Sequence, residues 1–362
     1  MKTLDFRSDT VTRPSPAMRS AMAEAEVGDD VLDGDPTLSR LEARVAELLR
    51  MEAALWVPTG SMGNLVALML HLERGDRFLA PAQAHVLASE LGTAAWIAGG
   101  MPEALPWEGG PGRPTPEQVT RAAGSPGPYF TLKTNLLCLE NTHNAAGGAV
   151  TGPVDHDALV RAARAAGLRV HLDGARIWHA AVALGCGLPE LTHGVDTVLV
   201  CLSKGLGAPM GSLVCGNKDA MRDARRLRKM LGGGIRQGGV MGAAGLFALD
   251  YLPRLAEDHA RAKELASGLR LLGFDVATPE TNIVRARVPN VARALVALRE
   301  ANVLATPLGE AAVRFVTHRD LDDADVRAAL TLVTSVADRI LASAPKSFAV
   351  DHSTDASRKR GT

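Results

Sequence analysis

Apolar residues recur along this chain at two spacings, and each spacing predicts a different element. In "DPTLSRLEARVAELLR" they return every three or four residues, which predicts a helix with Asp35 as its cap and Pro36 in its first turn. Four short apolar runs predict buried strands instead: "AALWVP", "NLLCLEN", "LRVHLDGAR" and "VDTVLVCLS". Because helices alternate with these strands, the pattern is typical of an α/β protein with a mainly parallel sheet.

Two further helices are expected beside these strands. One covers "LVALMLHLERG" and ends at Gly75, after a turn formed by "TGSMGN". The other covers "DHDALVRAARAAG", with Asp155 as its cap and Gly167 as its stop. The segment 101–128 is rich in proline and glycine, so we expect it to be an exposed excursion.

The 362 residues are too many for one simple core, and the pattern changes along the chain. Beyond residue 250 it predicts a smaller α/β unit, with helices over 254–272, 291–300 and 321–342 and strands over 281–288 and 312–317. We therefore predict four parts: an N-terminal arm (1–25), a large domain (26–250), a small C-terminal domain (251–343) and a disordered tail (344–362).

Composition narrows the classes of function. The 40 basic and 40 acidic residues balance, which argues against nucleic acid or an anionic membrane as partner, and only 4% of residues are aromatic. Cys138, Cys186, Cys201 and Cys215 form no CxxC pair and are expected to be small buried hydrophobes in a reducing compartment. With no leader-like start and no apolar run near ~18 residues, we expect a soluble, cytoplasmic protein.

Polar residues gather where the predicted strands end. In open α/β sheets ligands bind at the carboxyl ends of strands. Four predicted strands deliver candidate groups there: Thr59, Gly60 and Ser61; then Glu140 to Asn144, with His143 among them; then Asp173 to Arg176; then Ser203 and Lys204. These groups suit an aldehyde cofactor that carries a phosphate and a pyridine ring.

Each candidate has two interpretations. Lys204 extends to solvent, or it lies in a partly desolvated pocket as a nucleophile toward aldehydes. The "GLGAP" after it implies a tight turn with backbone close to a neighbour, and we expect that neighbour to be the cofactor. Asp173 is a cap or ion-pair partner, or it keeps a pyridine nitrogen protonated. Arg176 pairs with Asp173, or it binds a carboxylate or the cofactor's phenolate.

Each of the remaining candidates, taken alone, also allows two interpretations. "TGSMGN" before a helix is an anion site by geometry or an ordinary turn; it is neither a Walker A loop nor a GxGxxG fingerprint. His85 stacks on a planar ring or is an ordinary histidine. His143 moves protons or caps a turn. Their joint order along the chain carries the argument.

In that order the sequence resembles the low-specificity L-threonine aldolase family, from about Asp5 to His318. The matching stretches include "DFRSDTVTRPSPAMRSAM", "PTGSMGN", "LENTHN", "HLDGARI", "CLSKGLGAPMGS", "RKMLGGGIRQ" and "VRFVTH". The resemblance implies a pyridoxal 5'-phosphate (PLP) enzyme of fold type I, with a seven-stranded sheet in the large domain. It implies retro-aldol cleavage of L-threonine, L-allo-threonine and related β-hydroxy-α-amino acids to glycine and an aldehyde, in a cytoplasmic homotetramer with sites at the dimer interface.

The resemblance also assigns roles, position by position. Lys204 would carry PLP as a Schiff base, Asp173 would pair with the pyridine nitrogen, and His85 would stack on the ring. His85 or His143, or a water they hold, would take the proton of the β-hydroxyl. The remaining roles are phosphate binding by Thr59, Gly60 and Ser61, carboxylate binding by Ser8, Arg176 and Arg314, and contact of Arg236 with the phosphate in a neighbouring subunit.

Two stretches depart from the family pattern. Leu32-Asp33-Gly34 stands where the family commonly has Tyr-Gly-Glu, and smaller residues follow His85 (Val86 to Ser89) where aromatic residues are common. These changes affect the wall of the substrate site and not the cofactor groups. Two alternatives stay open from sequence: another fold-type-I PLP enzyme (a racemase, β-lyase or aminotransferase), or an α/β protein that uses no PLP.

Overall fold

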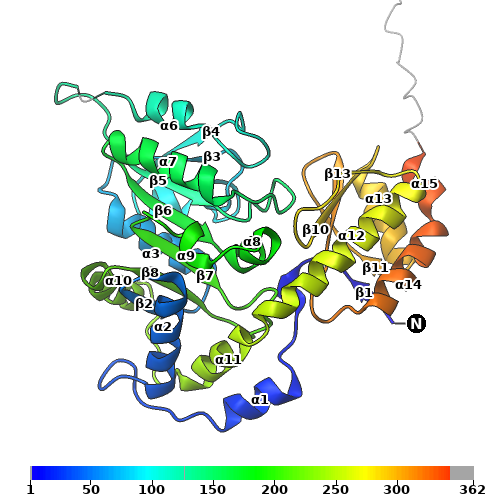
Figure 1. Ribbon diagram of the computed structural model, residues 1–362, viewed down its shortest axis with the longest axis horizontal. Helices are drawn as coiled ribbons and strands as arrows, with labels where there is room; N and C mark the ends of the chain where they lie inside the picture. The colour runs from blue at the N-terminus through cyan, green and yellow to red at the C-terminus, as the bar shows by residue number, and fades with distance from the viewer. Residues whose placement is uncertain (1, 126, 343–362) are drawn as a thin grey trace, which may run out of the picture.

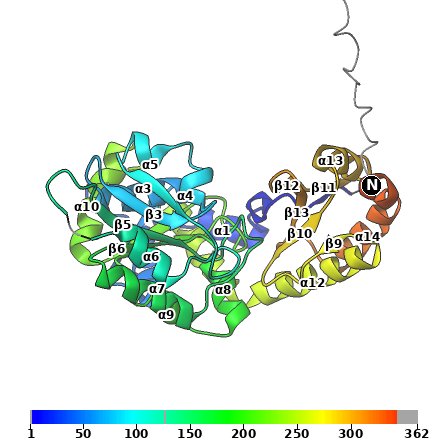
Figure 2. The same ribbon diagram turned by 90° about the horizontal axis from the view of Figure 1, so that it is seen from above.

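The computed structural model describes residues 2–125 and 127–342, which form a larger and a smaller α/β unit (Figure 1). The long helix α12 (Leu255–Leu271) leads from the larger unit into the smaller one, as Figure 2 shows from a second direction. Among the described helices, none has the length and apolar character needed to cross a bilayer. The predicted tail, 344–362, lies outside the described residues.

A seven-stranded sheet organises the larger unit, in the order β2-β8-β7-β6-β5-β3-β4. Only β8 runs antiparallel to its neighbours, so the other strands all run in one direction. Their carboxyl ends therefore meet at one edge, where open sheets bind ligands. The strands are β2 (Ala53–Val57), β3 (Arg77–Pro81), β4 (Met101–Leu105), β5 (Thr134–Glu140), β6 (Arg169–Gly174), β7 (Thr197–Cys201) and β8 (Ser212–Gly216).

Helices cover both faces of this sheet, as the alternation of side chains along its strands requires. Within β5, Leu137 and Leu139 pack on one face, and Leu136 and Cys138 on the other. The first face carries α2 (Pro36–Leu49), α6 (Pro116–Ala123), α7 (Pro153–Ala165), α8 (Ile177–Leu184), α9 (Leu188–Leu191) and α11 (Gly239–Leu249). The second carries α3 (Gly60–His71), α4 (His85–Ala88), α5 (Thr93–Trp96) and α10 (Lys218–Met230).

The smaller unit has an antiparallel sheet of its own, in the order β12-β13-β10-β9. Apolar side chains of this sheet and of its helices form a core separate from that of the larger unit. Its elements are β9 (Asp275–Val276), β10 (Ile283–Arg287), β11 (Val303–Leu304), β12 (Thr306–Pro307), β13 (Ala312–Val316), α12, α13 (Val291–Glu300), α14 (Asp323–Thr334) and α15 (Ala337–Leu341).

The N-terminal segment connects the two units. Its strand β1 (Leu4–Asp5) pairs with β11 of the smaller unit. Phe6 packs edge-on against Phe315 of the same unit, with ring centres 6.2 Å apart. After a 3₁₀ turn (Asp9–Val11), α1 (Pro16–Ala23) places Met18 in the core of the larger unit. The domain bounds drawn from sequence stay a prediction, but the arm is packed against both units.

Several predicted helices are confirmed, but the residues at which they begin and end were predicted correctly only in part. The side chain of Asp35 accepts from the Leu38 amide at 2.9 Å and begins α2, as expected. "TGSMGN" is not a separate turn, because α3 already begins at Gly60. This helix ends at His71, before it reaches the predicted stop at Gly75. Asp155 is not the cap of α7: Gly152 takes that place, and Pro153 holds the first helical position.

Three other expectations are wrong. The segment 101–128 is exposed or partly exposed at most described positions, but it is not an excursion: it contains β4, which pairs with β3, and α6, which begins at a capping box formed by Thr115 and Gln118. The helix over 321–342 is two helices, since the Ser335 hydroxyl donates to the Leu332 carbonyl where α14 ends. Cys186 is partly exposed, whereas the other three cysteines are buried.

Candidate active site

Six of the predicted site residues line one cavity at the carboxyl edge of the large sheet. The cavity has a volume of about 360 Å³, within the range of small-molecule sites. β2, β6 and β7 and the segments that follow them supply most of its wall. The predicted residues in the wall are Thr59, Gly60, Ser61, His85, Asp173 and Lys204, joined by Thr10, Asn64, Ala175, Cys201, Pro209 and Met210 among others.

The N-terminus of α3 forms one end of the cavity. Thr59 caps the helix by accepting from the Met62 amide at 3.2 Å, and the other amides of the first turn have no acceptor within the helix. A Cβ on Gly60 would lie 2.9 Å from the Cys201 sulfur, and one on Gly63 would lie 2.2 Å from Leu199. The two glycines therefore let the helix end approach β7 closely, and Gly60 and Ser61, whose amides have no acceptor within the helix, line the cavity in an arrangement that suits an anion.

Asp173 lies at the end of β6 with its carboxylate held from two sides. Asn64 donates to one oxygen at 2.8 Å and the Ala175 amide to the other at 3.0 Å. Burial opposes ionisation, but the charges of His85 and Lys204 and the Asn64 hydrogen bond lower the pKa of Asp173 below its usual value. The cavity therefore contains a carboxylate that stays charged although its side chain is buried.

His85 is oriented by an acid that the site prediction lacked. Its Nδ1 lies 2.7 Å from Glu90, whose side chain is 1% exposed. The hydrogen bond to Glu90 outweighs burial and raises the pKa of His85, and the charge of Asp173 adds to the effect. Burial in turn raises the pKa of the Glu90 carboxyl. His85 thus presents a fixed, charge-stabilised imidazole to the cavity.

Asn64 joins the two acids, and a buried chain behind it determines its orientation. Its amide group donates to Glu90 at 2.7 Å as well as to Asp173, so its oxygen must face the other way, toward His171 Nε2 at 3.1 Å. Burial lowers the pKa of His171 to about 4, so this ring is neutral and donates to Asn64. Its Nδ1 then accepts from Thr197, at 2.9 Å. This series of hydrogen bonds from Thr197 through His171 fixes the Asn64 side chain so that its NH2 group points toward the carboxyl groups of Glu90 and Asp173.

Lys204 follows β7 in a tight turn. The Thr12 hydroxyl donates to its backbone carbonyl at 3.1 Å, so the N-terminal segment holds this turn. The glycines after it, which the sequence led us to expect beside the cofactor, are required by packing within the protein: a Cβ on Gly205 would meet His179 at 2.6 Å, and one on Gly207 would meet Arg319 at 2.5 Å. They let the turn pack against α8 and the smaller unit.

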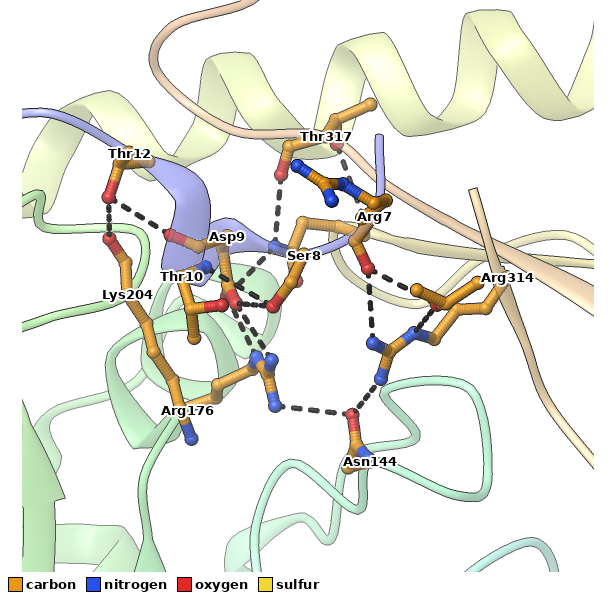
Figure 3. Close-up of polar contacts among 12 residues, drawn as sticks. Arg7, Ser8, Asp9, Thr10, Thr12, Asn144, Arg176, Lys204, Arg314 and Thr317 are labelled. Atoms are coloured by element: carbon orange, nitrogen blue, oxygen red, sulfur yellow. Dashed lines mark hydrogen bonds and ion pairs between the residues drawn. The ribbon is translucent and has the colours of Figure 1, made fainter. Parts of the chain in front are cut away.

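A second group of polar residues lies beside the cavity, where the N-terminal segment meets both units (Figure 3). Arg176 pairs with Asp9 through two bonds of 2.8 and 2.7 Å, and both side chains are buried. Burial alone would lower the pKa of Arg176, but Asp9 raises it; Arg176 in turn holds the pKa of Asp9 well below its usual range. Of the partners weighed from sequence, Asp173 is therefore not the one that Arg176 uses.

Arg314, on β13 of the smaller unit, reaches toward Arg176 from another side. Both guanidinium groups donate to the Asn144 side-chain oxygen, at 2.8 Å from Arg314 and 3.3 Å from Arg176 (Figure 3). Burial and the neighbouring charge of Arg176 lower the pKa of Arg314. Among the described residues no carboxylate lies within 4.0 Å of Arg314, so two cations meet at a neutral oxygen.

Besides Arg176 and Arg314, three predicted residues lie outside the cavity. Ser8 caps the 3₁₀ turn by accepting from the Thr10 amide, near Arg176. Arg236 pairs with Asp29 at 3.1 Å and is half exposed. His143 is buried against Trp107, with ring centres 5.2 Å apart, and does not line the cavity. The roles of these residues stay predictions.

The groups in this cavity suit PLP. An amine, a charged buried carboxylate, an oriented imidazole and a helix N-terminus could hold the aldehyde, the ring nitrogen, the ring face and the phosphate of this cofactor. Asp9, Asn64, Glu90 and Asn144 complete the site, and sequence reasoning assigned none of them a role. The sequence did contain a signal for Asn64: it lies one helical turn after Gly60, so a helix that begins at Gly60 places both residues on the same side.

Comparisons with known proteins agree with this class. A model of the beta-eliminating lyase family matches residues 5–290. Among solved structures, a Leishmania major threonine aldolase superposes with a TM-score of 0.77 at 20% identity, covering 92% of this chain and 99% of that one. A serine palmitoyltransferase structure containing PLP superposes with a TM-score of 0.73 at 18% identity, covering 93% and 87%. The fold is that of fold-type-I PLP enzymes.

Sequence relatives narrow the class. The probable low-specificity L-threonine aldolase 2 of Arabidopsis thaliana is 41% identical over 343 residues, covering 91% of this chain and 96% of the relative. The low specificity L-threonine aldolase of Escherichia coli K12 is 43% identical over 323 residues, covering 88% and 94%. The chain belongs to the low-specificity L-threonine aldolase family.

Proposed function

We propose that this protein is a PLP-dependent aldehyde-lyase that cleaves L-threonine, L-allo-threonine and related β-hydroxy-α-amino acids to glycine and an aldehyde. One observation carries the proposal: Lys204, Asp173 and the amide end of α3 line a single cavity, and two arginines meet beside it. The first set suits the cofactor, and the arginines suit an α-carboxylate. Together they define a site for an amino acid.

PLP, when bound, supplies an aldehyde that takes up amines and a ring that accepts the electron pair released when the Cα–Cβ bond breaks. The chain's own groups prepare this chemistry. Lys204 would provide the amine to which the cofactor attaches, and the amides of Gly60 and Ser61 would bind its phosphate. Asp173, kept ionised by its neighbours, would hold a proton on the ring nitrogen and so strengthen the ring as an electron acceptor.

The substrate is oriented by its carboxylate. Arg314 and Arg176 each direct one guanidinium nitrogen toward the same point, and Arg176 is itself held by Asp9. A carboxylate fixed there would orient the bonds of the substrate Cα, and orientation of this kind supplies much of enzymatic rate acceleration. Ser8 completes this side of the site.

A base must take the proton of the β-hydroxyl. His85 lines the cavity and can move a proton there, directly or through a water. His143 would act only if the substrate extends toward Trp107, because its ring lies outside the cavity wall. His85 is therefore the stronger candidate of the two.

The assembly belongs to the same proposal. The protein is a cytoplasmic homotetramer, a dimer of dimers, in which Arg236 contacts the cofactor phosphate of a neighbouring subunit. Arg236 is half exposed and outside the cavity of its own chain, which supports this role. Size-exclusion chromatography with light scattering measures the oligomeric state, and a monomer with full activity would refute the shared site.

The activity is tested by adding L-threonine to the protein loaded with PLP. We expect acetaldehyde and glycine in equal amounts, measured by a coupled dehydrogenase assay and by chromatography. L-allo-threonine and β-phenylserine, assayed in parallel, report the range of side chains accepted. Amino transfer to a keto acid without aldehyde release would contradict the proposal.

A further inference from the structure

The meeting point of Arg176 and Arg314 is occupied by a side chain of this protein. The atom between the two guanidinium groups is the Asn144 amide oxygen, since guanidinium nitrogens only donate and need an acceptor there. Figure 3 shows the two arginines reaching this oxygen from different sides. It is a neutral oxygen in the position where two cations converge.

The other two nitrogens of each arginine also have partners within the protein. Arg176 uses Nε and Nη2 for Asp9, and Arg314 uses Nε for the Thr306 hydroxyl and Nη2 for the Arg7 carbonyl. Each arginine therefore has one nitrogen, Nη1, whose partner is the Asn144 oxygen. A ligand that bridges the two arginines along the same Nη1 directions, and so leaves the buried pair with Asp9 intact, takes the place of this oxygen.

The charges favour that exchange. Asp9 balances Arg176, but among the described residues Arg314 has no carboxylate within 4.0 Å. A half-buried guanidinium with only neutral acceptors is poorly compensated, and hydrogen bonds to a charged partner are roughly twice as strong as those between neutral groups. A carboxylate would therefore displace the amide.

Asn144 is also placed so that its side chain can leave while its backbone stays. The backbone N–H of Asn144 donates to the Glu140 carboxylate at 2.8 Å, and the backbone carbonyl of Asn144 accepts from the Gly147 N–H at 3.1 Å. The same Glu140 side chain accepts from the His85 amide, so the loop is anchored to the cofactor cavity. Only the side-chain torsions of Asn144 need to change.

We propose that Asn144 is a displaceable substitute for the substrate carboxylate. In the free protein its oxygen keeps Arg176 and Arg314 together in their binding geometry, and the α-carboxylate of an amino acid replaces it on binding. Asn144 thereby sets the affinity for α-carboxylates and bridges the large and small units when no substrate is bound. This inference rests on the proposed function, because it assigns the two arginines to a substrate carboxylate.

The test compares ligands with and without a carboxylate. Glycine has the carboxylate; 1-aminopropan-2-ol has the side chain of threonine without it. Their dissociation constants are measured by the visible spectrum of the PLP-loaded protein for wild type, Asn144→Asp and Asn144→Ala. The control is Asn217→Asp, which adds the same charge at the cap of α10, at the opposite edge of the sheet, where aspartate caps equally well.

In Asn144→Asp a fixed carboxylate pairs with both arginines, so we expect glycine to bind at least about tenfold more weakly, while the amine changes by less than about twofold. In Asn144→Ala the competitor is absent, so glycine binds as tightly as in wild type or more tightly. Asn217→Asp should match wild type for both ligands. Because the alanine variant introduces no new charge, it separates competition from general disruption of the site.

Two results would overturn the inference. Glycine affinity that falls more than about threefold in Asn144→Ala would mean that the amide assists carboxylate binding. Equal losses of affinity for glycine and the amine in Asn144→Asp would mean a structural role. A wild-type spectrum that responds to neither glycine nor L-threonine would instead contradict the proposed function itself.

Discussion

The two halves of the active site are built differently. The cofactor half comes from the ends of strands in one sheet and from the helix that follows β2, so the larger unit supplies most of its groups, while Thr12 of the N-terminal segment holds the Lys204 turn. The carboxylate half is assembled from three segments: Asp9 of the N-terminal segment, Asn144 and Arg176 of the larger unit, and Arg314 of the smaller. The first draws most of its groups from one domain, whereas the second requires the packing of two units and the segment that joins them.

Removing the central group of the cofactor half should have the largest effect. Lys204→Ala takes away the amine to which PLP attaches, so we expect threonine cleavage to fall at least about 10⁴-fold. Borohydride reduction followed by mass spectrometry should find the cofactor on Lys204 in wild type and nowhere in the variant. The fold should persist, since the Thr12 bond holds the backbone of this turn and not its side chain.

A matched variant is Lys218→Ala, at the exposed start of α10 on the opposite edge of the sheet. It should keep wild-type activity. Reducible cofactor attached to the Lys204→Ala protein would refute the assignment of Lys204.

Breaking the carboxylate half should instead cost stability. Asp9→Asn leaves the Arg176 charge buried without its partner, and we expect the free energy of unfolding to fall by about 3 kcal/mol, measured by urea denaturation at pH 7. Because the folded-state pKa of Asp9 is held low, the pair's contribution is complete above about pH 4 and is lost as the pH falls through the folded value. The difference between wild type and variant should therefore shrink in acid.

The comparison for Asp9 is Asp5→Asn, which removes an ion pair with the half-exposed Arg7. Surface pairs contribute little, so the loss should be below about 1 kcal/mol. Equal losses in the two variants would show that burial does not distinguish the two pairs.

The smallest effect concerns the pH dependence of the cofactor half. The bond to Glu90 raises the pKa of His85, so Glu90→Gln, which removes the charge, should lower the pH at which the His85 ring titrates. Histidine NMR signals of the loaded protein measure that midpoint. If His85 is the base, the corresponding limb of the activity profile should move to lower pH by the same amount.

Glu103→Gln serves as the control, because Glu103 lies on β4, at the far edge of the same sheet, paired with Arg77. The His85 midpoint should not change in this variant. A midpoint that rises in Glu90→Gln would contradict the assigned role of Glu90.

The comparison also explains what could be predicted from sequence. Strand ends are local features: an apolar run followed by polar residues predicted where Thr59, Asp173 and Lys204 lie, and parallel packing brings such ends together. The same reasoning failed where signals were weak or shared. Segment 101–128 has many prolines and glycines and still contains β4 and α6, because pairing with β3 and a capping box outweigh composition.

The sequence by itself determined the α/β class, the helix cap at Asp35, the strand ends that supply the cofactor groups and, through its motifs, the family. Only the tertiary structure decided which partner Arg176 takes, that Glu90 and Asn64 connect His85 to Asp173, and that Asn144 stands between two arginines. The reason is distance along the chain: Arg176 and Asp9 are 167 residues apart, and Arg314 and Asn144 are 170 apart. No local pattern of apolar and polar residues carries information about contacts of that range; the packing of the two units creates them.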